Sequence, residues 1–395
     1  MKKNKMILIN SVCYGSTGRI MRNIQSVANN LGFDTLALHG RGEDYDLKCE
    51  KYGNFFSFWY HVFLTTLLDI HGKGSKYYTK KMINRIKKFE PNIIWLHNIH
   101  GYYLNYPMLF KYLKEEYKGK VIWTLHDCWT FTGHCPHFEH IACSKWLKQC
   151  YKCEQKTKYP ISLFKDNSYN NYLLKKESFT GVKDLTIITP SKWLEKKVKQ
   201  SFLQNYKTLT LYNGVDTNKF KKTISKDVYK NYNIPENKKI LISVANVWDN
   251  SKGLDKYIEL SKKLPNEYRI VLVGMTKKQI KNLPYNIIGI EKVNSNELIK
   301  LYSISYLFLN FTKADTFPTV NLEAISCSLP VLSLDTGGCS EQITSKVGKI
   351  IKYENTLEEI EKFDKNKFDN KEWEDIFRLE TFEKNVMEIL NEVIK

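Results

Sequence analysis

The chain has 395 residues, of which 42% are hydrophobic and 26% are charged. This length is too great for one ordinary hydrophobic core, so we expect a globular protein of two domains rather than a disordered or fibrous chain. No run of about eighteen apolar residues occurs, which excludes a predicted membrane-spanning helix. The basic start MKKNKMILIN leads into an apolar run too short for a signal peptide, so the sequence predicts a cytoplasmic protein.

The net charge of +19 fits three explanations: a nucleic-acid partner, an anionic membrane surface, or a lysine-rich proteome. The lysines are spread along the whole chain and form no motif interleaved with aromatic residues, so we expect no nucleic-acid partner. One denser basic segment, residues 73–88, follows an aromatic and aliphatic stretch at 55–64. Apolar residues beside a basic segment favour a peripheral membrane contact. A core-packed helix followed by a solvated helix stays open as the alternative.

In chain order, a buried strand is predicted at 6–9, followed by the loop 15–19 and a helix at 20–30. The loop contains Gly18, and a Gly/Ser/Thr loop at a helix N-terminus can hold a phosphate or a sugar hydroxyl. The spacing is not GxGxxG, so a dinucleotide site is not indicated. A tight turn with no ligand explains the loop equally well.

Two further strands are predicted at 92–96 and 121–125, with a helix at 107–117 between them. Histidines follow both strands: His97 and His100 after the first, and His126 after the second. Side chains at the carboxyl ends of parallel strands lie on the ligand edge of a sheet. We take His126 as the strongest of these site candidates, although single histidines are often structural.

A cysteine-rich insertion follows at 128–153. Since the chain carries no export signal, its nine cysteines do not indicate a disulfide framework. One pair has the CxxC spacing of a zinc half-site, and two more cysteines lie upstream. The candidate ligands of a structural zinc are therefore Cys135, Cys143, Cys150 and Cys153. The alternative is a set of reduced, partly buried thiols.

After a strand at 185–188 and a helix ending near 202, the lysine- and asparagine-rich stretch 219–239 reads as a linker. The strand and helix alternation then restarts with strands at 240–244 and 270–274. Lys252 lies in the first loop of this second half, where a cation can neutralise a diphosphate.

The stretch 307–334 reads as a strand, an acidic loop, a helix and a strand. Asp315 lies in the loop, and the helix begins near Thr319 and carries Glu323 one turn further on. The first amides of such a helix suit a phosphate, here those of Thr319, Val320, Asn321 and Leu322. A carboxylate such as Glu323 can accept hydrogen bonds from two ribose hydroxyls. Together these groups suggest a nucleotide-sugar site, although an ordinary βαβ unit with a surface glutamate explains the stretch without a ligand.

The spacing Asp315-x7-Glu323 resembles the acidic-x7-acidic motif of retaining glycosyltransferases of family 4, which have the GT-B fold. Gly337-Gly338 and the turn Asn213-Gly214-Val215-Asp216 stand in family-like places as well. The cysteine-rich insertion is similar to that of the exopolysaccharide or colanic-acid branch. The resemblance implies two doubly wound, Rossmann-like α/β domains facing across a cleft, at 1–213 and 214–375. It also implies a C-terminal helix, 376–395, that returns to the first domain.

The resemblance implies transfer of a sugar, with retention, from a nucleoside diphosphate sugar to a hydroxyl acceptor. Lys252 and the helix amides would stabilise the diphosphate and Glu323 would bind the ribose. Asp315 and His126 would contact the donor sugar, and the loop of Gly18 would face the phosphate. The implied acceptor is a polyprenyl-linked glycan at the inner face of the plasma membrane. No metal is expected for catalysis, because no DxD-like pair ends a strand.

Two positions depart from the family pattern. Asp315 stands where the family usually has glutamate, and Asn246 stands where it usually has arginine. The resemblance therefore implies a donor-site role for Asn246, but its neutral side chain lacks the positive charge of the arginine. These departures keep a catalytically silent GT-B scaffold open as an alternative, beside a basic nucleic-acid-binding protein.

Overall fold

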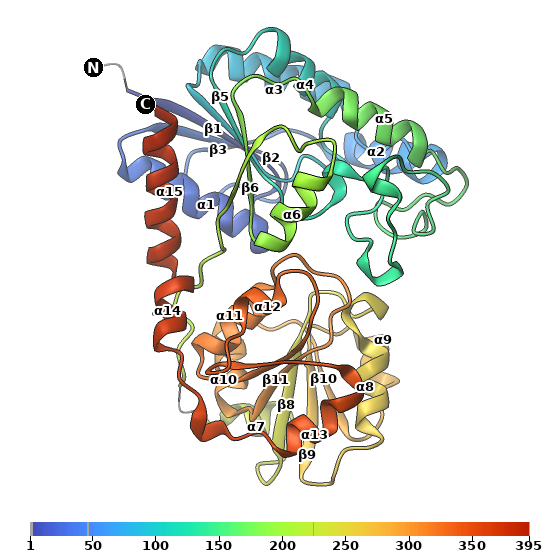
Figure 1. The fold of residues 1–395 in the computed structure, drawn as a ribbon, viewed down its shortest axis with the longest axis vertical. Helices are drawn as coiled ribbons and strands as arrows, with labels where there is room; N and C mark the ends of the chain where they lie inside the picture. Colours follow the sequence, from blue (N-terminus) through green and yellow to red (C-terminus); the bar gives the residue numbers. More distant parts are fainter. Residues whose placement is uncertain (1–2, 46, 224, 395) are drawn as a thin grey trace. The chain divides into compact units, whose positions relative to one another are not determined.

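A computed structural model describes residues 3–45, 47–223 and 225–394, and it divides into two compact units. Unit 1 comprises Met1–Tyr212 together with Glu383–Lys395, and unit 2 comprises Asn213–Phe382. Each unit is built on one parallel sheet with helices packed against it (Figure 1). The predicted class of two doubly wound α/β domains is confirmed. Within the described ranges, every helix is too short or too polar to cross a membrane.

The sheet of unit 1 has seven strands in the order β3-β2-β1-β4-β5-β6-β7. The strands are β1 (Lys5–Val12), β2 (Asp34–Arg41), β3 (Cys49–Lys51), β4 (Ile93–Leu96), β5 (Lys120–Thr124), β6 (Leu185–Thr189) and β7 (Lys207–Thr210). Neighbouring strands all run parallel, and the central ones are buried on both faces because helices cover both. The chain progresses outward from β1 in one direction and from β4 in the other, so the topological switch point lies between β1 and β4.

The helices of unit 1 form the two outer layers. They are α1 (Gly15–Asn30), α2 (Phe55–Leu68), α3 (Lys76–Phe89), α4 (Tyr106–Glu115), α5 (Ser168–Phe179) and α6 (Lys192–Gln200), joined by most of α15 (Leu379–Ile394). Figure 1 shows α3, α4 and α5 on one face of the sheet and α1 and α6 on the other. The core between them is aliphatic and aromatic, with Trp95 and Trp123 fully buried.

The insertion after β5 extends beyond the predicted 128–153 and continues to the start of α5 at Ser168. It contains three short 3-10 turns, η1 (Trp129–Phe131), η2 (Glu139–Ile141) and η3 (Lys145–Leu147). Two buried charged residues fasten it to the rest of unit 1. Asp69 follows α2 and accepts hydrogen bonds from the backbone N–H of Asn167 (2.8 Å) and from His134 Nδ1 (2.7 Å). Lys175, in α5, donates to the carbonyl oxygens of Trp129 and Thr132 at 2.6 and 2.9 Å. The insertion is thereby held against helices α2 and α5.

The sheet of unit 2 has six parallel strands in the order β10-β9-β8-β11-β12-β13. The strands are β8 (Lys239–Val244), β9 (Tyr268–Val273), β10 (Ile287–Ile290), β11 (Leu307–Asn310), β12 (Val331–Leu334) and β13 (Gly348–Ile351). This is the same order as in unit 1, with the switch point between β8 and β11.

Eight helices of unit 2 are described, besides the first residues of α15 and the 3-10 turns η4 (Asn250–Lys252), η5 (Tyr353–Asn355) and η6 (Lys365–Lys367). They are α7 (Asp227–Asn231), α8 (Leu254–Ser261), α9 (Lys277–Lys281), α10 (Ser295–Ile304), α11 (Thr319–Ser326), α12 (Cys339–Gln342), α13 (Thr356–Glu361) and α14 (Lys371–Phe377). Helix α11 packs on β11 and β12, so its first turn lies beside the loop that follows β11.

Two sequence predictions about element boundaries were wrong. The first helix begins at Gly15 rather than at residue 20, so Gly18 lies in its first turn and not in a free loop. The stretch 219–239 is no linker. Phe220, Val228 and Ile234 are buried in unit 2, and the stretch contains the short helix α7. Its polar composition hides these three spaced apolar anchors; residue 224 lies outside the described residues.

The chain leaves unit 2 beside the place where it enters it. Val215 pairs with Arg378 in an isolated parallel bridge, with hydrogen bonds from Val215 N–H to the Phe377 carbonyl and from Leu379 N–H to the Val215 carbonyl, both 2.8 Å. A Cβ on Gly214 would lie 2.8 Å from Cβ of Phe382. Glycine is required at position 214 because the segments around Gly214 and Phe382 are packed closely together.

Candidate active site

The candidate site of unit 2 lies at the switch point of its sheet, where the loops after β8 and β11 meet. Tyr257, buried in α8, fixes the end of β11. Its hydroxyl donates to the carbonyl of Leu309 (2.8 Å) and accepts from the N–H of Phe311 (3.1 Å). Because β8 and β11 are neighbours, the residues that follow them are held at the same edge of the sheet. This is the usual ligand edge of a doubly wound fold.

Backbone contacts tie the two loops to each other. The N–H of Lys313 donates to the carbonyl of Ser251 at 2.7 Å. Gly253 has a positive φ of 74°, and a Cβ there would lie 2.4 Å from the carbonyl oxygen of Phe311. The η4 turn before it is capped by Asp249, which accepts from the N–H of Ser251. The position of Lys252 at the end of η4 is thus set by backbone geometry.

The structure brings the predicted residues Lys252 and Asp315 together. Lys252 Nζ lies 2.7 Å from Asp315 Oδ2, with 32% and 23% of the two side chains exposed. Lys252 Nζ is also within 3.4 Å of the hydroxyl of Thr312 and the carbonyl of Ala314. Burial works to lower the pKa of Lys252, but the Asp315 carboxylate outweighs it and raises that pKa. Lys252 is therefore a fixed cation at the strand edge.

Helix α11 begins directly behind this pair, with Pro318 at its N-cap. A helix cannot satisfy its first N–H groups internally, here those of Thr319, Val320 and Asn321. The N–H of Asn321 makes a long bond to the Pro318 carbonyl (3.3 Å). Its side chain joins Asn310 (2.8 Å) to Gln342 (2.9 Å) inside the unit. We therefore assign the ligand-facing role to the first amides of α11 and a structural one to the Asn321 side chain.

The loop after β12, which contains Gly337 and Gly338, packs against the loop that contains Asp315. Gly337 has a φ of 57°, and a Cβ there would lie only 1.7 Å from the carbonyl oxygen of Asp315. The N–H of Gly338 donates to the carbonyl of Thr316 at 3.1 Å. The predicted Gly337-Gly338 pair thus has a physical reason: any side chain at position 337 would displace Asp315.

Glu323 lies one turn into α11 and is only 7% exposed. The N-terminus of α11 falls between Asp315 and Glu323 in the chain. Leu322 is fully buried beside it, so any contact of Leu322 with a ligand is through its backbone. Asn246, in contrast, is exposed in the loop after β8, and no described contact connects it to Lys252 or Asp315.

Unit 1 has its own polar edge at the switch point between β1 and β4. Asn10, fully buried, donates to the carbonyl of Val12 (2.9 Å) and accepts from the N–H of Asn98 (3.2 Å), which joins the ends of the two strands. Gly18 is buried in the first turn of α1, where a Cβ would lie 2.4 Å from the carbonyl carbon of Cys13. Sequence reasoning missed Asn10; a polar residue ending an apolar strand was the available signal.

His126 and His97 form a pair at this edge. Their rings stack with centroids 5.4 Å apart, and His97 Nδ1 lies 3.1 Å from His126 Nε2. Burial lowers the pKa of His126 to about 4, against a smaller opposing effect of Asp127, and holds the pKa of His97 well below its usual value. Both imidazoles are neutral near pH 7, so His126 supplies no positive charge at this edge.

His100 was a predicted site candidate, but its two contacts were not predicted. His100 Nε2 lies 3.0 Å from Asp127 Oδ2, and its Nδ1 lies 2.9 Å from the hydroxyl of Tyr159 in the insertion. Burial works to raise the pKa of Asp127, but His100 outweighs it and lowers that pKa to about 2. His100 and Asp127 therefore connect the strand edge to the insertion.

The comparisons with known proteins concern both units. Residues 225–373 match the protein family described as glycosyl transferases, group 1. Unit 2 carries a glycosyltransferase group 1 domain. The matched range contains Lys252, Asp315, the first turn of α11 and Glu323, so the group 1 domain includes the complete candidate site of unit 2.

Relatives of the whole chain are more distant. It is 22% identical over 282 residues to the putative colanic acid biosynthesis glycosyl transferase WcaC of Escherichia coli (strain K12). The alignment covers 68% of this chain and 66% of WcaC, just under two thirds of that relative.

Solved structures match over nearly the full length. Sucrose-phosphate synthase from Thermosynechococcus elongatus has a TM-score of 0.71 at 13% identity and is matched over 99% of both chains. Anabaena HepE in complex with UDP-glucose has a TM-score of 0.66 at 13% identity, over 98% of this chain and 99% of that one. These likenesses show that the group 1 domain belongs to a chain of GT-B fold.

The four predicted zinc ligands, outside the group 1 domain, line one small cavity in the insertion of unit 1: Cys135, Cys143, Cys150 and Cys153. Cys150 Sγ accepts from the N–H of Gly133 at 3.2 Å. A hydrogen bond from Cys135 lowers the pKa of Cys153 to about 7, so one thiol is poised to ionise. Four thiols suit zinc as a donor set. Among the described residues, no three of these four sulfur atoms all lie within 4.8 Å of one another.

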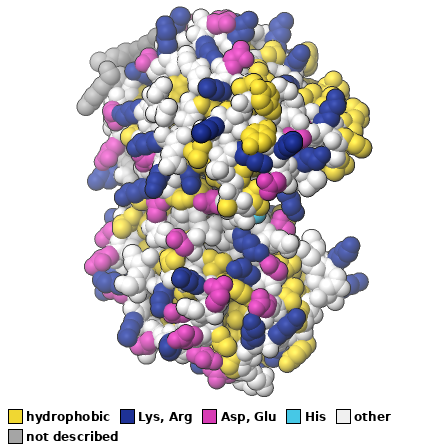
Figure 2. Space-filling view, turned by 45° about the vertical axis from the view of Figure 1, so that its right-hand side comes forward, with side chains coloured by type: hydrophobic (Ala, Val, Ile, Leu, Met, Phe, Trp, Pro, Cys, Tyr) yellow, Lys and Arg dark blue, Asp and Glu magenta, His cyan; other side chains and the backbone are white. Residues whose placement is uncertain are grey.

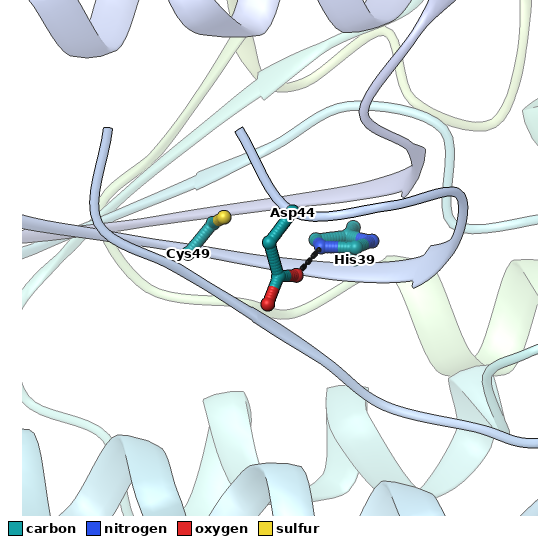
Figure 3. A group of neighbouring side chains, drawn as sticks. All are labelled: His39, Asp44 and Cys49. Atoms are coloured by element: carbon teal, nitrogen blue, oxygen red, sulfur yellow. Dashed lines mark hydrogen bonds and ion pairs between the residues drawn. The ribbon is translucent and has the colours of Figure 1, made fainter. Parts of the chain in front are cut away.

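A different trio does meet that distance, at the carboxyl end of β2 in unit 1. Figure 3 shows His39, Asp44 and Cys49, whose ligand atoms lie within 4.8 Å of one another. His39 Nε2 bonds to Asp44 Oδ1 at 2.9 Å, and its Nδ1 lies 3.2 Å from the carbonyl of Arg41. Both ring nitrogens thus have protein partners. We infer that the contacts among these three residues hold the loop between β2 and β3 in place.

Proposed function

We propose that the chain is a retaining glycosyltransferase that moves a sugar from a nucleoside diphosphate sugar to a hydroxyl of its acceptor. The observation that carries the proposal is the meeting of Lys252 and Asp315 in front of the first turn of α11, with Glu323 behind them. All of these residues lie inside the matched range 225–373. HepE, a structural neighbour, was solved with UDP-glucose, which supports a donor of that class.

The roles follow from charge and position. In the transfer, the bond between the anomeric carbon and the diphosphate oxygen breaks, and its electron pair stays on the diphosphate. Lys252 and the amides of Thr319 and Val320 stabilise that growing negative charge. The acceptor oxygen forms the new bond on the same face of the sugar and gives its proton to the oxygen of the departing diphosphate. Glu323 accepts hydrogen bonds from the ribose hydroxyls, and Asp315 positions the donor sugar.

We also assign His126, on unit 1, to a hydrogen bond with the donor sugar. Its depressed pKa keeps the imidazole neutral, which suits a hydroxyl partner better than a phosphate. Gly18 is assigned to the diphosphate through the backbone of the first turn of α1, on the strength of the family resemblance, and its missing side chain makes room for the backbone of Cys13. Asn246 is assigned only to a peripheral contact with the donor, because it is exposed.

For the acceptor we propose a lipid-linked oligosaccharide in surface polysaccharide synthesis, at the cytoplasmic face of the plasma membrane. The similarity to WcaC, named for colanic acid biosynthesis, supports the polysaccharide class. The exposed aromatic residues of unit 1 support a membrane-associated acceptor.

The test is a transfer assay with a panel of nucleotide-sugars and polyprenyl-linked acceptors, followed by mass spectrometry and by NMR of the anomeric proton. We expect one donor to give a product with the anomeric configuration of the donor. Inversion would contradict the retaining mechanism. Binding of nucleotide without transfer or hydrolysis of any donor would favour a catalytically silent scaffold.

A further inference from the structure

Helix α2 of unit 1 is apolar in sequence, yet it lies at the surface and exposes most of its large side chains. Its fourteen residues contain no charged side chain, and only His61 and Thr65 are buried. Five aromatic side chains lie on the outside instead, exposed by 52 to 78%: Phe55, Phe56, Trp59, Tyr60 and Phe63. Surface helices normally bury their apolar stripe and expose polar residues.

The helix is held firmly in this orientation by its polar inner face. His61 Nε2 accepts from the N–H of Gly72 (2.9 Å), and its Nδ1 lies 3.0 Å from the hydroxyl of Ser75. Asn54 and Ser57 form a capping box at the N-terminus of α2. At the other end Asp69 is the C-cap and is bonded to the insertion. The exposed aromatic residues are therefore presented by a well-anchored helix.

A loop of the insertion extends the same surface. The N–H of Leu163 donates to the carbonyl of Thr66 in α2 at 2.9 Å, which places the loop beside the helix. Ile161, Leu163 and Phe164 are exposed by 45, 55 and 70%. We call α2 and residues 161–164 together the aromatic face. Scattered apolar residues on a surface are ordinary, but a contiguous group of this kind indicates a binding surface.

Lysines surround the aromatic face on two sides. Lys156 Nζ lies 3.4 Å from the Phe164 carbonyl, and Lys158 and Lys165 are exposed in the same part of the insertion. Lys73 and Lys76 line a groove with Tyr60, beyond the other edge of α2. Asp166, an exposed acidic residue of the same loop, is bonded to the backbone of Cys153 and Ser168. In Figure 2 hydrophobic and basic side chains gather at the upper right edge of unit 1.

We propose that the aromatic face inserts into the surface of a lipid bilayer with anionic headgroups. Phe side chains gain by leaving water, Trp and Tyr favour the interface between headgroups and acyl chains, and the lysine rim is attracted to anionic lipids. The absence of any charged residue from α2 and the basic rim favour a bilayer over a protein partner with a mixed surface. The inference deepens the proposed function, because a lipid-linked acceptor requires the enzyme at a membrane.

The test is co-sedimentation of the full chain with vesicles of phosphatidylcholine alone or with 30 mol% phosphatidylglycerol, about one lipid in three being anionic. The test variant is Phe56→Ser/Trp59→Ser, and the control is Tyr285→Ser, which removes a 90% exposed aromatic residue of unit 2. We expect wild type and control to sediment with the anionic vesicles, with binding reduced about tenfold or more in the double variant. Binding should weaken at 0.5 M salt because screening acts on the lysine rim.

Wild type that stays in the supernatant, or a double variant that binds like wild type, would overturn the inference. So would a wild-type dimer that becomes monomeric in the double variant while neither binds vesicles, since the aromatic face would then join two copies. Because the replaced residues are exposed, the melting temperatures should be equal. Nucleoside diphosphate binding should be the same in all three proteins, so its failure reports on the proposed function and not on the aromatic face.

Discussion

Lys252 Nζ and Asp315 Oδ2 lie 2.7 Å apart although 63 residues separate them in the chain. The pair joins the first loop of unit 2 to the acidic loop in front of α11, at the switch point of the sheet. Such a partly exposed ion pair contributes little to stability. In the proposed function, the pair holds a cation where the diphosphate would meet the first amides of α11.

Lys252→Met should weaken nucleoside diphosphate binding roughly ten- to a hundredfold, the range for losing a charged hydrogen bond. Lys313→Met is the matched control, since Lys313 makes a comparable pair with Asp255 at 2.8 Å in the same region. Titration calorimetry on both variants measures the effect. Equal losses in the two would show that Lys252 acts only through the general positive field.

Glu323→Gln should reduce transfer by at least about a hundredfold, because an amide cannot accept hydrogen bonds from both ribose hydroxyls as a carboxylate does. The exposed Glu354 of the same unit provides the control Glu354→Gln. Initial rates with the preferred donor, together with the melting temperatures, separate catalysis from folding. Unchanged turnover in Glu323→Gln would remove the ribose assignment.

His126 should stay neutral across the working range, because burial lowers its pKa to about 4. We therefore expect kcat/KM to show no ionisation of His126 between about pH 6 and 8, while His126→Ala lowers kcat through the lost hydrogen bond. The measurement is a pH–rate profile of both proteins. A limb with an apparent pKa near 6.5 that disappears in His126→Ala would mean that the residue works as an acid or a base.

Acid should destabilise unit 1 through His61, whose pKa burial lowers to about 4 from an ordinary value of 6.5. The unfolded chain takes up this proton first as the pH falls, so the free energy of unfolding should drop between pH 6.5 and 4, by up to about 3 kcal/mol. His61→Gln keeps an acceptor for the Gly72 N–H but does not titrate. Urea unfolding at several pH values should show a shallower acid slope in His61→Gln, and an identical slope would contradict this role.

The cysteine cavity should bind one zinc ion if the four thiols close around it. Purified protein would then contain about one equivalent by elemental analysis, and chelation would lower the melting temperature. Cys150→Ser/Cys153→Ser should lose the metal, whereas Cys327→Ser, a buried cysteine of unit 2, should retain it. Protein without zinc that is equally stable with and without chelator would leave the four thiols as packing residues.

The sheets could be predicted because their strands are short apolar runs. Residues 307–311, for example, correspond to β11, and the helix expected near Thr319 begins there. The start of α1 was harder: Tyr14 at its N-cap makes no side-chain capping bond, so the Gly-Ser-Thr stretch looks like a loop. Burial of Phe220 and Val228 depends on packing far from their own stretch, which composition does not reveal.

The contacts between the site residues could not be predicted from the sequence. His97 and His126 are 29 residues apart, and only the pairing of β4 with β5 brings them into contact. The orientation of α2 was also hidden, since an apolar helix without charges shows no periodicity that indicates which face is inside. The buried bonds of His61 decide it.

The most direct test of the account is nucleoside diphosphate binding by the purified chain, compared with that of Glu323→Ala. We predict saturable binding of one nucleoside diphosphate at or below millimolar concentration, with a raised melting temperature that the variant loses while its fold is retained. If no nucleoside diphosphate shifts the melting temperature of the wild type at millimolar concentration, or if Glu323→Ala binds equally well, the assignment of a donor site to Lys252, Asp315 and Glu323 is contradicted.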